Sequence, residues 1–362
     1  MSDKDTREVD KEKGLKEQDR QKKKKWWIVL VVILAVLAVA VISVYAVVKH
    51  YYSKSNYVKD SDVTVAESVE TESTGLTEEE TNALEAETAD ILDDITLPND
   101  KNVYNILLVG VDRRDKSWNG NSDSMILVSI NKDTKKIHMT SFMRDLYASI
   151  PGKGVHKLNA SCAYGGGPLV VRTIEDNYKI PIDNYASVDF DAMIDIVDLV
   201  GGVTIDISDA EVEVANNYVT EMCKLREEDP AKHYISNGGE QLLDGYQAVA
   251  YARIRYVGNS DYQRTERQRE VLTKIMEKAK GLSIGELNTL ANRLLPMVTH
   301  NIDEGTMLTL LTEVPTFLSY ENVQSRVPYD GMFSSKGEML VPDFASTIKK
   351  LQTDIYGDSA VE

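Results

Sequence analysis

The chain has few of the residues on which common catalytic and metal-binding motifs depend. Its 362 residues include two cysteines and five histidines, and the histidines are scattered along the sequence. No GxxxxGK[ST], HExxH or GxSxG motif occurs, and no Cys/His pair has the spacing of metal ligands. The glycine run at 165–167 lacks the Lys-Ser/Thr of a nucleotide-binding loop, so it predicts a flexible turn before a helix. These absences argue against a P-loop nucleotidase, a zinc protease and a Ser–His–Asp hydrolase.

The chain also lacks net positive charge. Lysine and arginine number 41 against 58 aspartates and glutamates, which gives a formal net charge of -17. A general nucleic-acid-binding protein would carry a broad basic surface, so no nucleic-acid partner is expected. The charge is unevenly distributed, because the first 25 residues are basic and residues 60–100 are strongly acidic.

One long apolar run predicts a membrane anchor. Residues 26–48 are interrupted only by Ser43 and Tyr45, and as a helix they would span roughly 34 Å, enough to cross a bilayer core. Lysines at 22–25 precede the run, so the N-terminus is expected to stay in the cytoplasm and the body of the protein outside. A cleaved signal peptide ending near Ala38-Val39-Ala40 is the alternative.

Both cysteines lie in the part that is predicted to be exported. Export permits a disulfide between Cys162 and Cys223, whereas two unpaired buried thiols are the alternative. Neither cysteine belongs to a CxxC motif, so the sequence leaves pairing open.

The remaining pattern predicts four regions. These are a disordered cytoplasmic tail (1–25), a transmembrane helix (26–48), an acidic extracytoplasmic stalk (49–100) with a helical turn or two around 78–92, and a folded domain (101–357). Predicted strands span residues 104–111, 124–130, 137–142 and 203–207, and predicted helices span residues 169–178, 190–200, 242–252, 261–280, 284–295, 305–318 and 342–355. This mixture indicates an α/β layered domain with a mixed central sheet covered by helices. Residues after 280 either complete this domain or form a small separate one.

The helix predicted at 261–280 has an unusual apolar face. Arg264 and Gln268 fall on the same stripe as Val271 and Ile275, where a solvated charge would normally be excluded. A buried arginine needs an anionic partner, because an unpaired buried charge costs several kcal/mol. That partner is either an internal carboxylate or a bound anion.

Other basic residues lie at the ends of predicted elements. Arg144 follows a strand, Lys157 lies in a turn-rich segment, and Arg253 and Arg255 would share one side if the chain is extended there. Each alone fits a solvated surface charge. In a chain of net negative charge, however, the set indicates a local site for phosphate, whose oxygens match the planar fork of arginine.

Two carboxylates lie at the edges of predicted strands near these arginines. Asp112 ends one strand and Asp123 precedes the next. Beside a phosphate site, such a pair has the chemistry of a Mg²⁺ (or Mn²⁺) site, because magnesium takes oxygen ligands and shares them with substrate phosphates. Caps of a turn and of a strand end are the alternative roles.

Seven blocks, in order, resemble the LytR-CpsA-Psr phosphotransferases of bacterial envelopes. They are YNILLVGVD (104–112), NSDSM (121–125), SFMRDLYASIPGKGVHKLNASCAYGGG (141–167), DNYASVDF (183–190), LVGGVTIDI (199–207), LLDGYQAVAYARIRY (242–256) and DYQRTERQ (261–268). The chain departs from the family pattern in a slightly shorter loop between Asp112 and Asp123, and in Phe142-Met143 where Ile-Pro is commoner. Neither change removes a reactive group, although the loop could shift the metal.

The resemblance implies an apolar tunnel between sheet and helices that holds a polyprenyl chain, with its pyrophosphate against arginines at the mouth. By this resemblance Asp112 and Asp123 are the magnesium-associated acids. The expected pyrophosphate contacts are Arg144, Lys157, Arg253, Arg255, Arg264 and Gln268, and the residues expected to take part in catalysis are Arg144, Arg253, Asp123 and Asp261. Asp123 and Asp261 are also the two hypotheses for the group that takes the acceptor's proton.

The implied function is transfer of a phosphate-linked glycopolymer from a polyprenyl pyrophosphate carrier to peptidoglycan at the bacterial cell membrane. Two alternatives use the same residues. One is hydrolysis of the polyprenyl pyrophosphate, and the other is a non-catalytic lipid-binding membrane regulator. The identity of the glycopolymer cannot be inferred from the sequence.

Overall fold

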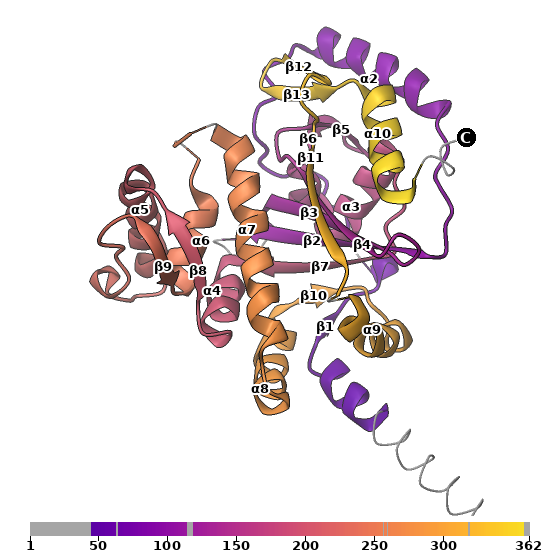
Figure 1. Ribbon diagram of the computed structural model, residues 1–362. Coiled ribbons are helices and arrows are strands. Elements are labelled where there is room, and N and C mark those ends of the chain that lie inside the picture. The colour runs from indigo at the N-terminus through magenta and orange to yellow at the C-terminus, as the bar shows by residue number, and fades with distance from the viewer. Residues whose placement is uncertain are drawn as a thin grey trace, which may run out of the picture. The chain divides into compact units, whose positions relative to one another are not determined.

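The computed structural model describes residues 45–62, 64–113, 119–255, 257–258, 260–317 and 319–357 (Figure 1). The chain divides into two compact units, Met1–Ser53 and Lys54–Glu362. In the first unit residues 45–52 are helical, while the predicted tail and residues 26–44 of the predicted span lie outside the described residues. None of the described helices combines the length and apolarity required to cross a bilayer.

A seven-stranded mixed sheet forms the centre of the second unit, as the sequence predicts. Its strand order is β1-β10-β7-β2-β3-β4-β11. Strand β3 pairs antiparallel with both β2 and β4, whereas β7 pairs in parallel with β2 and β11 pairs in parallel with β4. The strands of this sheet are β1 (Asn56–Tyr57), β2 (Val103–Asp112), β3 (Asn121–Asn131), β4 (Lys136–Phe142), β7 (Asn184–Asp189), β10 (Thr299–His300) and β11 (Glu321–Val327). Three strand pairs lie outside it, namely β5 (Tyr147–Ile150) with β6 (Gly154–Lys157), β8 (Val203–Ile207) with β9 (Gly239–Leu243), and β12 (Phe333–Lys336) with β13 (Met339–Pro342).

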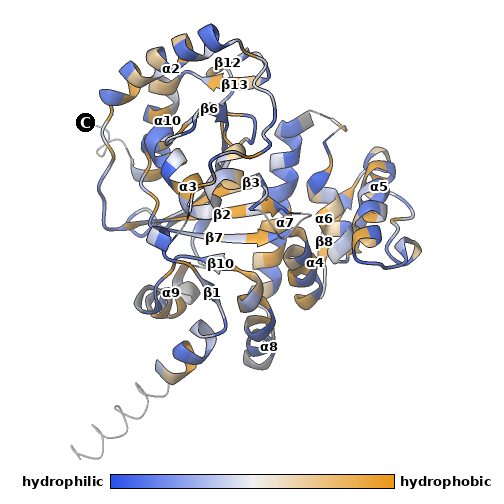
Figure 2. Ribbon diagram, turned by 180° about the vertical axis from the view of Figure 1, so that it is seen from behind, coloured by the Kyte–Doolittle hydropathy of each residue, from blue (hydrophilic) through white to orange (hydrophobic). Residues whose placement is uncertain are grey.

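The helices are α2 (Glu78–Asp93), α3 (Ala160–Tyr178), α4 (Phe190–Leu199), α5 (Asp209–Leu225), α6 (Gly245–Arg253), α7 (Ser260–Lys280), α8 (Ile284–Leu294), α9 (Glu304–Phe317) and α10 (Phe344–Tyr356). They cover both faces of the sheet because alternate residues of β2 point to opposite sides. Leu107 and Val109 enter the core beneath α3 and α10, whereas Leu108 faces the side of α4 and α7. Figure 2 shows hydrophobic residues on β2 and on the neighbouring faces of α4 and α7.

A second core holds the helical part of the domain together. Helices α5 and α6 and the β8–β9 pair surround Val219, Cys223, Leu243 and neighbouring apolar residues. Cys223 is therefore in a different core from Cys162, which lies in the first turn of α3, and both cysteines are free and buried. The structure thus has the two unpaired thiols rather than the disulfide.

The acidic segment differs from a free stalk. From Lys54 onward it belongs to the folded unit, where β1 pairs with β10 and Ala66 donates its backbone N–H to the carbonyl of Tyr164. Helix α2 begins with a capping box between Thr77 and Glu80 and buries Leu84. Its apolar side packs against α10, so the segment is held although it is rich in acidic residues. Residues after 280 also join the same unit, since β10 and β11 belong to the central sheet.

The glycine run is a kink inside α3 rather than a turn before it. Gly166 has a φ of 61°, which favours glycine, and a Cβ on Gly167 would overlap the ring of Tyr185 on β7. Gly167→Ala is therefore expected to destabilise the fold by about 1–3 kcal/mol through overpacking. Thermal denaturation checks this value, with Gly285→Ala as the control, because a Cβ there meets nothing within 4 Å. An unchanged melting temperature for Gly167→Ala would contradict the close helix–strand contact.

Candidate active site

An apolar cavity of about 280 Å³ lies between the sheet and the helices α4, α6 and α7. Strands β2, β3 and β7 form its floor, and the three helices form its other walls. The apolar side chains that line it include Leu108, Ile126, Val188, Met193, Val271 and Ile275. The position of this cavity between sheet and helices and its apolar lining match the tunnel that the sequence resemblance implies for a polyprenyl chain.

A polar cavity of about 330 Å³ adjoins the apolar one. The two share Gly110, Ser124, Phe190, Arg253 and Gln268 in their linings, so they meet at the ends of β2 and β3. The polar cavity brings together most of the predicted site residues, namely Asp112, Asp123, Arg144, Arg253, Arg255, Arg264 and Gln268. An extended apolar chain with an anionic head matches the two adjoining environments.

The apolar face of α7 carries Arg264 and Gln268 inward, as its periodicity predicts. Arg264 is 5% exposed and pairs with Asp261 at 3.0 Å, so this buried arginine has an internal carboxylate partner. Burial lowers its pKa, although Asp261 and Asp123 oppose the shift. Gln268 donates from Nε2 to the backbone carbonyl of Asp123 at 3.3 Å, which connects α7 to β3 at the cavity.

Arg144 sits beyond the end of β4 and contacts two carboxylates in the cavity lining. Its Nη1 lies 2.9 Å from Oδ1 of Asp123 and 3.4 Å from Oε1 of Glu72. Burial opposes the charged form, but the negative charges of Asp123 and Asp145 outweigh it and raise the pKa of Arg144. Arg144 is therefore a permanently charged group held at the cavity wall.

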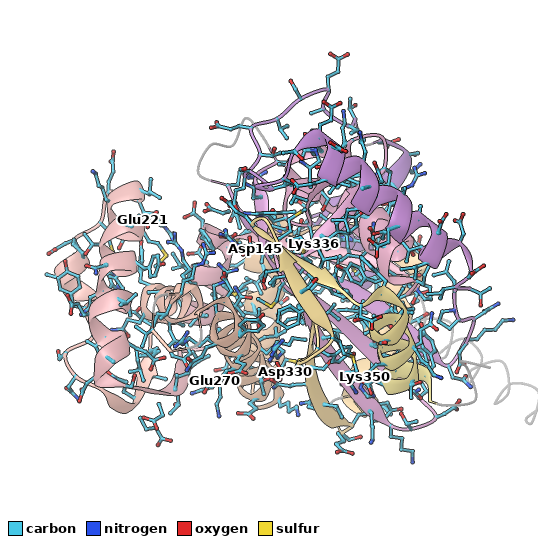
Figure 3. The ribbon with its side chains drawn as sticks, turned by 90° about the horizontal axis from the view of Figure 1, so that it is seen from above. Asp145, Glu221, Glu270, Asp330, Lys336 and Lys350 are labelled. Atoms are coloured by element: carbon cyan, nitrogen blue, oxygen red, sulfur yellow. The ribbon has the colours of Figure 1, made fainter. Side chains whose placement is uncertain are left out.

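Arg253 ends α6 at the junction of the two cavities. Its guanidinium lies 4.6 Å from the ring centroids of both Phe190 and Tyr218, and its Nη2 is 3.4 Å from Glu221 on α5. The rings and the carboxylate hold the planar group in one orientation. Figure 3 shows Glu221 on the side of α5 and Asp145 toward the centre of the domain.

Asp261 holds two of the arginines rather than lining the cavity. Its carboxylate accepts from Arg255 at 2.8 Å and pairs with Arg264 at 3.0 Å. Arg255 also approaches Asp145 at 3.5 Å. Burial and the nearby charge of Asp261 raise the pKa of Asp145, although Arg144 and the other cations around it oppose the shift.

Lys157 lies beside the site but outside the lining of either cavity. It is 6% exposed, and its Nζ is 3.2 Å from Glu72, 3.3 Å from Glu338 and 3.8 Å from Asp145. The structure therefore places Lys157 at the centre of a carboxylate cluster, not against the cavity where a pyrophosphate would lie.

Asp112 and Asp123 line the polar cavity from adjacent strands. Pairing of β2 with β3 shifts register between Gly110 and Val111, opposite Asp123. Within the described residues, no group of three or more His, Cys, Asp or Glu side chains could hold a metal ion. A magnesium site does not require three protein ligands of this kind. Magnesium commonly binds one or two carboxylates and completes its coordination shell with water and substrate phosphates.

Sequence reasoning missed several residues of the lining, namely Glu72, Phe190, Tyr218 and Glu221. Phe190 ends one of the recognised blocks, so its place could have been inferred. Tyr218 and Glu221 are three apart on α5 and share a face, but nothing local shows that this face meets Arg253. Glu72 is one of many acidic residues in a segment that lacks any pattern.

The chain is similar in sequence to known bacterial proteins. Among curated relatives, it is 33% identical over 236 residues to Biofilm regulatory protein A of Streptococcus mutans serotype c, which covers 62% of this chain and 54% of that protein. It is 36% identical over 187 residues to the polyisoprenyl-teichoic acid–peptidoglycan teichoic acid transferase TagT of Bacillus subtilis (strain 168), which covers 51% of this chain and 55% of that protein. The chain thus spans little more than half the length of these relatives.

Solved structures show the same relationship. A structure of TagT with bound octaprenyl pyrophosphate lipid matches with a TM-score of 0.51 and 27% identity, over 70% of this chain and 91% of that one. The model described as the LytR_cpsA_psr family matches residues 63–353. The match covers every strand of the central sheet except β1, both cavities and every predicted site residue, and the chain belongs to the LytR-CpsA-Psr family.

Proposed function

We propose that this protein transfers a phosphate-linked glycopolymer from a polyprenyl pyrophosphate carrier to peptidoglycan. The observation that carries the proposal is the junction at Arg253 and Gln268, where an apolar cavity meets a polar cavity lined by four arginines. The relative TagT is named for such a transfer and has been solved with octaprenyl pyrophosphate lipid. The polyprenyl chain would occupy the apolar cavity, and the pyrophosphate would occupy the polar one.

The arginines perform two tasks in this proposal. They hold the pyrophosphate oxygens in place, and they stabilise the negative charge that builds on them as an acceptor hydroxyl attacks the phosphorus next to the glycan. The new phosphodiester forms as the bond to polyprenyl phosphate breaks. Arg253 is oriented by Phe190 and Tyr218 before substrate arrives, so little reorganisation accompanies the reaction.

The acceptor's proton requires a base near the cavity. Asp123 lines the cavity, whereas Asp261 is bound by Arg255 and Arg264 outside the lining. This arrangement favours Asp123 over Asp261 as the base. Asp261 is instead a positioning residue that holds the two arginines.

Asp112 and Asp123 would hold Mg²⁺ (or Mn²⁺) in this proposal. The ion would neutralise part of the charge on the phosphate oxygens. Because the protein supplies only two carboxylates, binding of the metal is expected to depend on the pyrophosphate.

Calorimetric titration of Mn²⁺ into the full-length protein tests this dependence. We expect weak binding to the protein alone and binding at least about tenfold tighter with octaprenyl pyrophosphate present, because phosphate oxygens complete the shell. Asp112→Asn should remove most of this gain, whereas Asp206→Asn, an exposed change on β8, should keep it. Equal affinity with and without the lipid would contradict the shared metal site.

Anchoring by a single transmembrane helix at 26–48 completes the proposal, with the N-terminus in the cytoplasm and the catalytic domain outside the bacterial cell membrane. The apolar run and the basic residues before it support this topology. A substrate with a polyprenyl tail is itself confined to the membrane, so anchoring would keep enzyme and substrate together.

Product analysis tests the proposed function. The full-length protein in detergent micelles would be incubated with Mg²⁺, a glycan-linked polyprenyl pyrophosphate and peptidoglycan fragments, and the products identified by mass spectrometry. We expect a glycan-phosphate-peptidoglycan adduct, and Arg253→Ala should form it about 100- to 1,000-fold more slowly. Free glycan phosphate without an adduct would indicate hydrolysis, and unchanged lipid that remains bound would indicate a binding module.

A further inference from the structure

A carboxylate from outside the recognised motifs reaches the basic residues of the site. Oε1 of Glu72 lies 3.4 Å from Nη1 of Arg144, and its Oε2 lies 3.2 Å from Nζ of Lys157. Glu72 also lines the polar cavity, together with the arginines. An anionic side chain thus contacts one of the cations to which the proposed function assigns the pyrophosphate.

The segment that carries Glu72 is fixed to the domain at both ends. We call residues 64–77 the strap. On one side of Glu72, the N–H of Ala66 donates to the carbonyl of Tyr164 at 2.8 Å. On the other side, the N–H of Glu338 donates to the carbonyl of Thr74 at 2.8 Å. These contacts place Glu72 at the cavity even though no regular secondary structure surrounds it.

A carboxylate and a phosphate compete for the same partner here. Both present oxygens that accept charge-assisted hydrogen bonds from a guanidinium, and Nη1 of Arg144 already faces Asp123 and Glu72. A pyrophosphate that contacts Arg144 must therefore displace Glu72 or lie beside it against electrostatic repulsion. We propose that Glu72 occupies the position of a substrate phosphate group at Arg144, so that the strap sets how tightly the site binds polyprenyl pyrophosphates and withdraws Glu72 when they bind.

Removing Glu72 should leave the fold intact. Arg144 would keep Asp123 and Asp145 as partners, and Lys157 would keep Glu338 and Asp145. Neither buried cation would lose all of its neutralising charge, so no unpaired buried charge arises. Glu72→Gln can therefore be used to measure the competition rather than misfolding.

The expected effect follows from the fraction of molecules in which the site is open. When Glu72 occupies part of the population of sites, the apparent dissociation constant equals the intrinsic one divided by the open fraction. Two ion pairs to Glu72, whose side chain is 36% exposed, correspond to roughly a threefold to tenfold change in the dissociation constant. Glu72→Gln is expected to bind octaprenyl pyrophosphate tighter by this factor, at low salt, in the full-length protein in detergent micelles.

The matched control is Glu70→Gln, which makes the same charge change on the strap at an exposed position. Its affinity should equal that of the unsubstituted protein, whereas Arg144→Ala should weaken binding. If Arg144→Ala weakens binding but Glu72→Gln behaves like Glu70→Gln, the inference about the strap is wrong and the proposed function stands. If the lipid fails to bind, or binds independently of Arg144, the proposed function and the inference that rests on it are both wrong.

Hydrogen–deuterium exchange gives a second readout that a purely structural role would not change. Octaprenyl pyrophosphate should increase exchange of backbone amides in the strap between Ala66 and Thr74, because Glu72 is displaced. In Glu72→Gln the exchange should already be raised without lipid. Slower or unchanged exchange in the strap on lipid binding would overturn the proposal.

Discussion

Replacing Arg253 with alanine is expected to lower kcat for polymer transfer about 100- to 1,000-fold, the usual loss when one preorganised donor to a developing oxyanion is removed. The guanidinium lies at the junction of the two cavities between Phe190 and Tyr218, so no neighbouring cation can move into its place without displacing both rings. KM for the lipid should change less than kcat, because the other arginines and the apolar cavity still hold the substrate. Steady-state kinetics with a glycan-linked polyprenyl pyrophosphate measure both constants.

Two further variants separate charge from shape. Arg253→Lys keeps the charge but loses the planar fork, and it should recover only part of the rate. Arg172→Ala removes an arginine from the surface of α3, where the side chain is 70% exposed, and it should retain full activity. A rate for Arg253→Ala within a few-fold of the unsubstituted protein would rule out a direct contact with the reacting phosphate.

Glu211→Ala is expected to destabilise the domain by about 3–5 kcal/mol, the range found when one partner of a buried ion pair is removed. Glu211 pairs with Arg267 at 2.6 Å, and Arg267 is 2% exposed, so the variant leaves its charge buried. The same carboxylate accepts from the N-cap residue Ser208 of α5, so the start of this helix is weakened as well. We expect a fall in melting temperature on the order of 10 °C.

The control is Glu213→Ala, an exposed residue on the same helix, which should change stability little. If Glu211→Ala also changed stability little, the ion pair between Glu211 and Arg267 would not be an important contact between α5 and α7.

The pH dependence of stability gives a second test of this ion pair. Burial acts to raise the pKa of Glu211, but hydrogen bonds from Ser208 and the charge of Arg267 outweigh it and lower the pKa.

A carboxylate with a depressed pKa in the fold stabilises the protein above its ordinary pKa, and that stability is lost as the pH falls through the folded-state pKa. The difference in stability between the unsubstituted protein and Glu211→Ala should therefore be constant near neutral pH. It should narrow only below about pH 4.5, the ordinary value for glutamate. Chemical denaturation across this range measures the difference.

Local pattern predicted the parts of the site that belong to regular elements. The 3.6-residue period of α7 is enough to show that Arg264 and Gln268 face the core, and the structure confirms both positions. The alternation at Arg253 and Arg255 likewise indicates one shared side, and both line the polar cavity. Apolar residues in short segments bounded by turn-forming residues likewise predict β2, β3 and β4.

Other elements had no local signal. Strand β7 has the sequence NYASVD, in which polar and apolar residues are mixed. It is nevertheless an interior strand of the sheet, because it pairs in parallel with β2 and antiparallel with β10. The segment ENVQSRV does not by itself predict a strand, although as β11 it pairs with all of β4. Such strands are defined by their hydrogen-bonded neighbours more than by their own composition.

The sequence by itself determined the family, the α/β class and the four arginines that line the polar cavity, because these depend on periodicity and on short motifs. Only the tertiary structure decided which charges meet. Lys157 lies among carboxylates outside the cavity, Asp261 holds arginines rather than facing substrate, and Glu72 reaches Arg144 across a sequence separation that no local pattern records. The physical reason is that an ion pair requires two oppositely charged groups within about 4 Å of each other. For groups far apart in the sequence, only the packing of the whole domain determines that distance.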